Sequence, residues 1–395
     1  MKTGTHEIIH RLPIELELIL SIMKLDRSSV SPEVIEAMAG PHIDWDRFLD
    51  LTKEHRLYPI VYANINKYNL SFIPAQVTSQ LNQMFVRNTM KMLQLTAVME
   101  KVCHTMEQSD IQSLVLKGPV LAEALFGDFS LRTSKDIDLL VPEESFEQAE
   151  QLLLQLGFQP DEHVPRALNA VKRNKHHLSY THPESRIQVE LHWRMSSDSF
   201  REFTFAELWE RRRQTKKTSK PVNYLGHEDL FTYLISHGAR HAWFRLRWLA
   251  DIECMMRSEM KWNTVSEYCR KLDLMHVAGQ VMVLLSELFD VPLDSRCRTM
   301  ADHAKARRLA EEAVKIIDEY IYLLGKQSPS AAKAYFRTYN ALILTPRQQW
   351  KRRINRFYPN YLDIKLLTLP RWLHFMYFPL RPILWFWRKK KRITV

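Results

Sequence analysis

The spacing of apolar residues changes at Ser113, and this change constrains the fold of the 395-residue chain more than any other feature. Before Ser113, apolar residues between 78 and 108 recur three, four or seven positions apart, which predicts one long amphipathic helix. After it, short apolar runs bounded by turn residues predict strands. The helical positions are Leu81, Phe85, Met92, Leu95, Met99, Val102 and Met106. A helical region therefore leads directly into a small unit that contains a sheet.

Residues 111–195 predict an α/β unit in which strands and helices alternate. Two apolar strands, each followed by a short helix, precede a pair of strands joined by a tight turn, which indicates a hairpin. The second helix is expected to begin with Ser145 as its cap and to end at Gly157. The expected strands are 114–116, 137–141, 178–181 and 186–193, and the expected helices are 119–126 and 145–157.

The rest of the chain is expected to be helical, so we predict a mainly helical α+β protein with one small mixed sheet. Between 230 and 248, apolar and aromatic residues at spacings of three and four predict a helical stripe. This stripe includes His237 and His241, which we expect to be buried in the core. The basic, polar stretch Arg211–Lys220 is expected to be a linker. The predicted domains are 1–110 (helical), 111–200 (α/β), 201–350 (helical) and 351–395 (a basic, aromatic segment).

The net charge of +11 comes entirely from the carboxyl-terminal segment. Residues 351–395 contain 12 basic residues and one acidic residue, Asp363, which leaves 44 of the 56 basic and 44 of the 45 acidic residues in the rest of the chain. A formally neutral body makes nucleic acid a less favoured partner.

The same segment contains ten aromatic residues, and arginines and prolines interrupt its apolar runs, so no transmembrane helix is expected there. Two interpretations remain open. The segment is either a peripheral contact for an anionic membrane surface or an acidic partner, or a helix docked on the body with a solvated basic end.

Cysteine usage and the amino terminus predict a cytoplasmic protein. Four cysteines are scattered through the chain without a CxxC pair, as expected for free thiols in a reducing compartment. Residues 1–20 lack a basic start followed by an apolar run, so they do not resemble a secretory signal. The predicted localisation is the cytoplasm, with peripheral attachment at the inner membrane surface if the terminal segment binds lipid.

Asp136 and Asp138 begin an apolar strand, and Glu190 lies on a later one. Side chains alternate along a strand, so the two aspartates share one face, and Glu190 has the same polar-face position among apolar neighbours. Adjacent carboxylates repel each other unless a cation lies between them. Three hard oxygen ligands suit Mg²⁺ or Mn²⁺, and a two-ion site would activate an attacking oxygen and stabilise a leaving pyrophosphate. The alternative is a polar strand end that binds no metal.

Small and basic residues next to these strands predict a phosphate site. Lys117 and Gly118 close the preceding strand and open a helix, whose free backbone N–H groups favour an anion. Arg132, Ser134 and Lys135 lead directly into the first aspartate. We therefore expect these five residues to border the same cleft as the carboxylates.

Together these segments resemble the DNA-polymerase-β-type nucleotidyltransferase superfamily. They are more closely similar to the family of uncharacterised nucleotidyltransferases, and the likeness covers roughly residues 40–390. It rests on residues 116–119 (LKGP), 132–141 (RTSKDIDLLV) and 189–193 (VELHW), and on the helical stretch 237–252. This combination is far more specific than the two aspartates alone.

The resemblance implies a central palm that moves a nucleoside monophosphate from an NTP to an acceptor and releases pyrophosphate. Asp136 and Asp138 would hold both metal ions, Mg²⁺ or Mn²⁺. Glu190 would complete the ion that activates the acceptor hydroxyl, and the five residues of the phosphate site would bind the NTP. Because related genes often lie in biosynthetic clusters, the implied acceptor is a small molecule or a modified peptide.

Pro119 departs from the superfamily pattern, which usually has Gly-Ser or Gly-Gly at positions 118–119. Proline offers neither a hydroxyl nor an N–H, so one expected phosphate contact is missing. Lys117, Arg132 or Lys135 is expected to replace it. Two other functions therefore stay open: a catalytically silent nucleotide-binding or scaffold protein, and template-independent addition to RNA, which the neutral body disfavours.

Two further residues are weaker candidates for the site. His192 follows Glu190 on the same face and could orient it or contact the acceptor, or could be a hydrogen-bonded structural residue. Arg240 could reach phosphates across a cleft or form a surface ion pair. The histidines near the hairpin lack the spacing of a zinc site, and no zinc is predicted for them. They are His176, His177 and His182.

Overall fold

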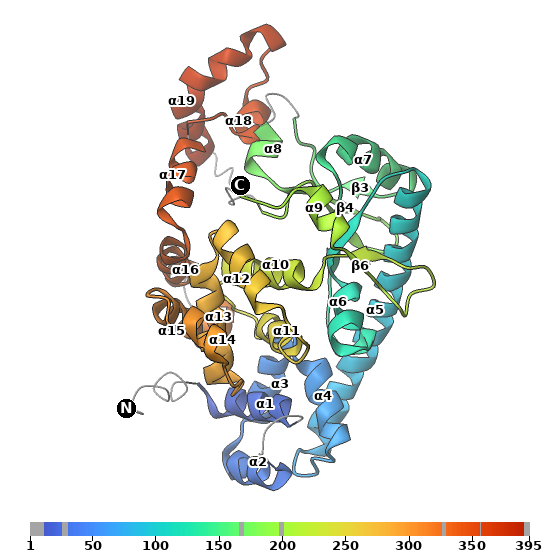
Figure 1. The fold of residues 1–395 in the computed structure, drawn as a ribbon, viewed down its shortest axis with the longest axis vertical. Coiled ribbons are helices and arrows are strands. Elements are labelled where there is room, and N and C mark those ends of the chain that lie inside the picture. The colour runs from blue at the N-terminus through green and yellow to red at the C-terminus, as the bar shows by residue number, and fades with distance from the viewer. Residues whose placement is uncertain are drawn as a thin grey trace.

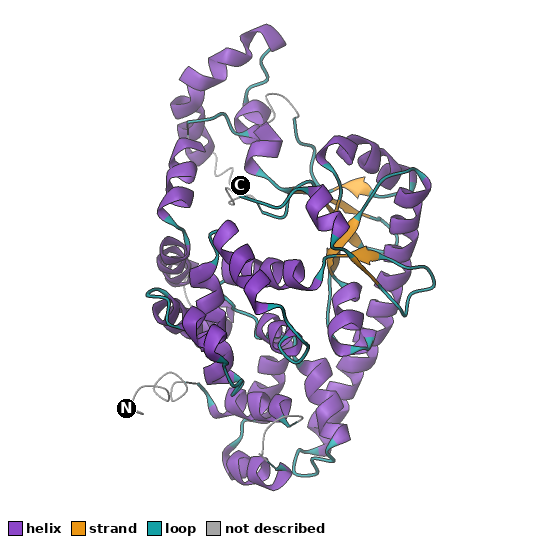
Figure 2. Ribbon diagram, viewed as in Figure 1, coloured by secondary structure: helices purple, strands orange, loops and turns teal. Residues whose placement is uncertain are grey.

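The computed structural model describes residues 12–25, 31–165, 170–196, 201–325, 329–355 and 357–390. Within them, one mixed seven-stranded sheet lies among many helices, which confirms the predicted mainly helical α+β class (Figure 1). Figure 2 shows that the strands gather in one part of the molecule and that helices make up most of the remainder.

The long amphipathic helix predicted between 78 and 108 is α5, Ala75–Gln108. Its residues Met92, Leu95 and Met99 are fully buried, and it packs against the second strand of the sheet and against helices on both sides of it in the sequence. Figure 1 shows α5 along one edge of the molecule, beside the sheet. The helices that precede it are α1 (Ile14–Lys24), α2 (Pro32–Ala39), α3 (Trp45–Glu54) and α4 (Tyr58–Lys67).

The strands follow the order β3-β4-β5-β2-β1-β7-β6. At the centre, β2 (Asp136–Leu140) pairs antiparallel with β1 (Leu114–Lys117) and parallel with β5 (Gln188–His192). The predicted hairpin is present, because β5 also pairs antiparallel with β4 (His177–Thr181). The edge strands are β3 (Gln159–Pro160) and β6 (Arg213–Gln214), and β7 (Asn223–Tyr224) lies between β6 and β1.

Helices connect these strands nearly as predicted. The two predicted helices are α6 (Pro119–Phe126) and α7 (Phe146–Gln155), and α8 (Ala170–Asn174), which was not predicted, precedes β4. The prediction that Ser145 caps α7 is wrong: Ser145 ends a 3₁₀ turn with helical dihedral angles, and its side chain accepts no capping hydrogen bond. A capping side chain needs an extended backbone at that position.

The stretch Arg211–Lys220 is not the linker that its composition predicts. Part of it forms β6, which pairs antiparallel with β7, and β7 joins β1 in parallel. The sheet therefore continues past residue 200. The polar composition reflects an exposed sheet edge, where charged side chains prevent pairing with another chain.

The predicted stripe between 230 and 248 spans two helices rather than one. The chain turns after α10, where Ala242 and Trp243 have φ values of +50° and +55°, and resumes in α11. The helices of this region are α9 (Phe205–Glu210), α10 (His227–Arg240), α11 (Arg247–Met255), α12 (Trp262–Lys271), α13 (Met275–Leu288) and α14 (Ser295–Ala301). Those that follow are α15 (Ala306–Gly325), α16 (Pro329–Ile343), α17 (Pro346–Asn355), α18 (Tyr361–Leu366) and α19 (Tyr377–Lys390).

The two faces of the central strands differ in chemistry. Ile137 and Leu139 of β2, with Val189 and Leu191 of β5, are completely buried in the core. Alternation then places the polar residues of both strands on the opposite face. That face is turned toward α10, and the site lies between them.

Candidate active site

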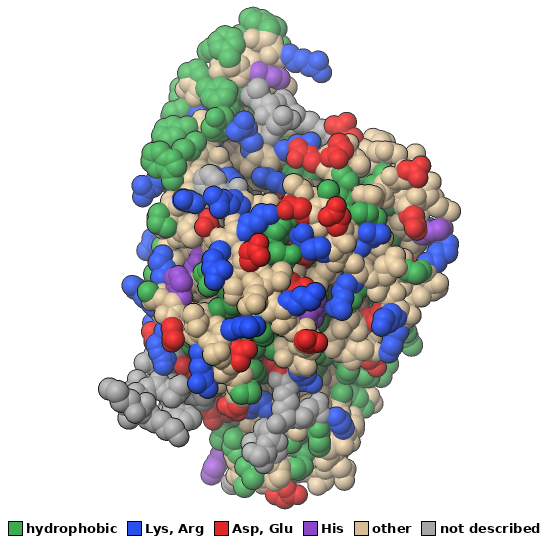
Figure 3. Space-filling view, viewed as in Figure 1, with side chains coloured by type: hydrophobic (Ala, Val, Ile, Leu, Met, Phe, Trp, Pro, Cys, Tyr) green, Lys and Arg blue, Asp and Glu red, His purple; other side chains and the backbone are tan. Residues whose placement is uncertain are grey.

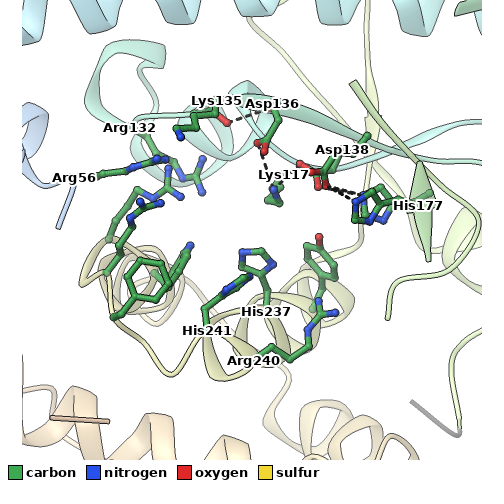
Figure 4. Close-up of a pocket in the computed structure, with 18 of the residues that line it drawn as sticks. Arg56, Lys117, Arg132, Lys135, Asp136, Asp138, His177, His237, Arg240 and His241 are labelled. Carbon is green, nitrogen blue, oxygen red and sulfur yellow. Dashed lines mark hydrogen bonds and ion pairs between the residues drawn. The ribbon is translucent and has the colours of Figure 1, made fainter. Parts of the chain in front are cut away.

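A cavity of about 400 Å³ lies between the polar face of the sheet and α10 (Figure 4). Strands β1, β2 and β5 supply one wall, and α10, the turn after it and the start of α11 supply the other. Nine of the ten residues predicted from the sequence line this cavity, and the tenth, Gly118, is hydrogen-bonded to Arg132 of the lining. The nine are Lys117, Arg132, Ser134, Lys135, Asp136, Asp138, Glu190, His192 and Arg240.

The three carboxylates reach the cavity from two adjacent parallel strands. In the register of β2 and β5, Asp138 is opposite Glu190 and Asp136 is opposite Gln188. Asp138 is completely buried, whereas Asp136 and Glu190 are half-buried. Strand alternation and the parallel register of β2 with β5 together bring all three acids to one face.

Lys117 lies between the two aspartates. Its Nζ is 2.8 Å from Oδ2 of Asp138 and 3.4 Å from Oδ1 of Asp136. Burial alone would lower the pKa of Lys117, but Asp138 and Asp136 raise it above its ordinary value. In this state Lys117 is a charged partner of the carboxylates rather than an open phosphate ligand.

His192 links the acids of the two strands. Its Nε2 is 3.1 Å from Oδ1 of Asp138 and 3.4 Å from Oε2 of Glu190. Burial would lower the pKa of His192, but hydrogen bonds to these two acids raise it. Burial would likewise raise the pKa of Glu190, yet the hydrogen bond from His192, with His177 and Lys117 nearby, lowers it to about 2. Glu190 is therefore ionised at neutral pH.

The donor atoms are close enough to share a cation. One atom each from Asp138, Glu190 and His192 lie within 4.8 Å of one another, which fits a divalent metal. Oδ2 of Asp138 accepts no hydrogen bond from the described residues, although it pairs with Lys117. Carboxylate oxygens suit Mg²⁺ and Mn²⁺, and the imidazole nitrogen adds affinity for later transition metals.

Two histidines that the sequence did not connect to the site also reach it. His176 and His177 lie next to His192, and their ligand atoms meet the same 4.8 Å limit with that residue. Burial and repulsion from His192 lower the pKa of His177 to about 4, so its ring is neutral and can bind metal. Their adjacency depends on the register of β4 with β5, which spacing along the chain does not reveal. His182 instead packs against Phe158.

Gly118 forms the turn between β1 and α6 with φ of +104°, a conformation that favours glycine. A Cβ there would lie 3.2 Å from the backbone oxygen of Asp136. The turn and the start of β2 therefore pack backbone against backbone. Ser134 supports the same junction, because its hydroxyl donates to the Asp136 carbonyl at 3.1 Å.

Arg132 is held by another acid. It is 2% exposed, and it makes two bonds to Asp251 on α11, from Nε to Oδ1 at 2.8 Å and from Nη2 to Oδ2 at 2.9 Å. Its Nη1 donates to the carbonyl of Gly118 at 3.3 Å. Arg132 thus ties the β1–α6 turn to α11, and Asp251 occupies two of its donor groups.

Three arginines from other parts of the chain line the cavity: Arg56, Arg245 and Arg247. Figure 4 shows Arg56 at the end of the cavity opposite His177. Burial and repulsion from Arg245 lower the pKa of Arg56 to about 10. Nε of Arg245 and Nε of Arg247 are buried and donate to no described residue. Sequence reasoning assigned none of the three arginines to the site, since no spacing links them to the aspartates.

A family model described as uncharacterised nucleotidyltransferase matches residues 41–290. The chain belongs to this family. The match contains the whole sheet, the three carboxylates and the arginine cluster, and membership supports a nucleotidyltransferase activity in general. No individual curated protein matches the chain.

In this nucleotidyltransferase the predicted helical stripe forms a wall of the cavity. The rings of His241 and Trp248 stack with centroids 5.1 Å apart, and Phe244 meets Trp248 edge-on at 4.9 Å. His237 and His241 line the cavity, so the expectation that both are core residues is wrong. Arg240 lies on the same wall, with Nη1 3.5 Å from Oγ of Ser196. The apolar spacing is genuine, but its aromatic rings face the cavity.

Residues after 290 lie beyond the family match. Among the described residues, no helix combines the length and the apolarity that crossing a membrane requires.

Proposed function

We propose that this nucleotidyltransferase depends on a divalent metal and moves a nucleoside monophosphate from an NTP to an acceptor hydroxyl, with release of pyrophosphate. One observation carries the proposal: a single cavity has three carboxylates in one wall and a cluster of buried and half-buried arginines at one end. Crowded cations are stable beside a polyanion, and crowded carboxylates beside metal ions. A nucleoside triphosphate bound with metal satisfies both.

Asp136, Asp138 and Glu190 are the residues that would hold Mg²⁺ or Mn²⁺. Bound there, the metal would activate the acceptor oxygen and neutralise the charge of the leaving pyrophosphate. His192 orients Asp138 and Glu190 through the contacts described above. Lys117 neutralises the aspartates in the protein alone. Once metal neutralises the aspartates, its long side chain can turn to the phosphates.

Arg56, Arg245 and Lys135 are the proposed triphosphate ligands. All three line the cavity, and none of them has an acidic partner as close as Asp251 is to Arg132. In this assignment, side-chain cations replace the backbone N–H contact that Pro119 cannot make. Phe244 is half-buried and lines the cavity, so its ring could contribute a stacking contact to a base.

The acceptor that we propose is a small molecule or a modified peptide in the cytoplasm, since the neutral body offers no track for RNA. A catalytically silent nucleotide-binding protein is the second candidate. The observation that favours it is Pro119 at the first position of α6, where the superfamily usually offers a phosphate contact.

Labelled NTPs test the proposal. The purified protein is incubated with a cell extract and with each NTP carrying ³²P at either the α or the γ position. We expect Mg²⁺-dependent transfer of the α label alone to an extract component, and loss of transfer in Asp138→Asn. Binding of NTP without transfer of either label would favour the silent protein, and transfer of the γ label would identify a different reaction.

A further inference from the structure

The carboxyl-terminal part of the chain displays an unusual amount of exposed apolar surface. Of the sixteen large apolar side chains that are exposed in the described residues, ten lie between 350 and 387. Figure 3 shows this surface as a run of green side chains along the end of the molecule that α17 and α19 form. The ten residues are Trp350, Ile354, Phe357, Trp372, Phe375, Phe378, Ile383, Trp385, Phe386 and Trp387.

This segment is docked on the body through a different set of residues. Arg173 and Lys175, at α8, lie over the rings of Tyr358 and Tyr361 at 4.3 and 5.0 Å. Within the segment, α19 packs on α18, and Tyr377 is fully buried. The residues that hold the segment on the body are therefore different from its exposed aromatic side chains.

The charge of this surface has one sign. Its single acid, Asp363, is completely buried and contacts both Arg381 and Arg388, the latter with Nε 2.9 Å from Oδ1. No described residue of the segment exposes a carboxylate, whereas several of its basic residues are exposed. These include Lys365, Arg371, Lys389 and Lys390.

We propose that residues 350–390 form a membrane-binding surface that docks on anionic phospholipid. Tryptophan and phenylalanine favour the boundary between headgroups and acyl chains, and lysine and arginine beside them attract acidic headgroups. An acidic protein would match the charge, but six exposed tryptophan and phenylalanine side chains on and just before α19 fit a lipid interface better. This inference concerns a surface outside the cavity and stands independently of the proposed reaction.

Vesicle co-sedimentation of the full-length protein tests the apolar component. We expect binding to vesicles of phosphatidylcholine mixed with phosphatidylglycerol, and at least tenfold weaker binding to phosphatidylcholine alone. The variant Trp372→Ser, Phe375→Ser, Trp385→Ser should lose most of its binding. The matched control is Val86→Ser, Met90→Ser, Leu93→Ser, which removes three exposed apolar side chains from α5 and should bind like the parent.

A second variant tests the charge. Lys389→Gln with Lys390→Gln should weaken binding to the anionic vesicles by about tenfold, with a smaller dependence on salt. Equal binding to neutral and anionic vesicles, or equal loss in the α5 control, would overturn the proposal. So would a parent protein that ignores vesicles and forms a dimer, measured by light scattering, that the aromatic substitutions dissociate.

Discussion

At the residue scale, Asp138 is the acid whose surroundings matter most. If Asp136 were the only charged neighbour of Asp138, neutralising Asp138 would relieve repulsion and would not destabilise the metal-free protein. The structure adds Lys117 and His192, which lie 2.8 and 3.1 Å from its two oxygens in a completely buried position. Removing one member of a buried charged group leaves its partners without compensation.

Asp138→Asn should therefore lower the free energy of unfolding of the metal-free protein by about 3 kcal/mol. Asp136→Asn should change it by less than about 1 kcal/mol, because Asp136 is partly exposed and its contact with Lys117 is longer, at 3.4 Å. Urea unfolding in EDTA measures both. Similar values for the two variants would show that Lys117 and His192 do not stabilise Asp138.

Glu190 gives the site a pH signature. Its pKa is lowered from 4.5 to about 2, so its contribution to stability is fully present above about pH 4.5 and is lost as the pH falls toward 2. The parent should exceed Glu190→Gln in stability by on the order of 3 kcal/mol at pH 6, and the difference should shrink between pH 4.5 and 3. Unfolding in EDTA at a series of pH values checks this. A difference that is constant with pH would contradict the lowered pKa.

At the element scale, the β1–α6 turn fixes where the carboxylates lie. The sequence predicted both elements because their apolar patterns are strong, and it predicted the shared face of Asp136, Asp138 and Glu190 because alternation is a local property. It could not predict the pairing of β6 with β7 or the break after α10. Those features depend on contacts with distant residues.

Gly118→Ala tests this turn against a matched glycine. Gly127 also has positive φ, at +69°, but a Cβ there would meet nothing within 4 Å, whereas Gly118 combines φ of +104° with the close Asp136 carbonyl. Gly127→Ala should cost about 1 kcal/mol of stability. Gly118→Ala should cost about 3 kcal/mol and should also weaken Mn²⁺ binding, because the start of β2 must move. Thermal melts measure the loss of stability, and titration measures the affinity for Mn²⁺. Equal effects of the two substitutions would disprove the backbone contact.

At the scale of the whole molecule, the cavity is assembled from segments far apart in the sequence. The family motifs indicated the sheet side of the site, whereas the histidines of the stripe between 230 and 248 were expected in the core and instead line the facing wall. Arg56 and Arg245 come from a helix–helix turn and from the loop before α11, so only the folded chain brings them together. The pairing of Arg132 with Asp251, 119 residues away, escaped prediction for the same reason.

Arg245→Gln separates a ligand site from a structural cluster. If repulsion among the arginines is relieved only by a bound polyanion, the variant should melt at the same temperature as the parent or slightly higher. Its affinity for inorganic tripolyphosphate should fall about tenfold. Arg270→Gln on the exposed side of α12 is the control and should change neither value. A destabilised Arg245 variant with normal affinity for tripolyphosphate would show that the arginine cluster stabilises the fold and does not bind phosphate.

The central claim is that metal and nucleotide bind together in this cavity, and calorimetric titration tests it most directly. The ligands are the four α,β-methylene NTP analogues, which cannot be cleaved at that bond, each titrated with Mg²⁺ and with EDTA into the parent and into Asp136→Asn. We predict that Mg²⁺ increases the affinity of the parent for at least one analogue by tenfold or more, and that this increase disappears in the variant. Affinity that is independent of Mg²⁺ in the parent, or an undiminished response in Asp136→Asn, would contradict the account.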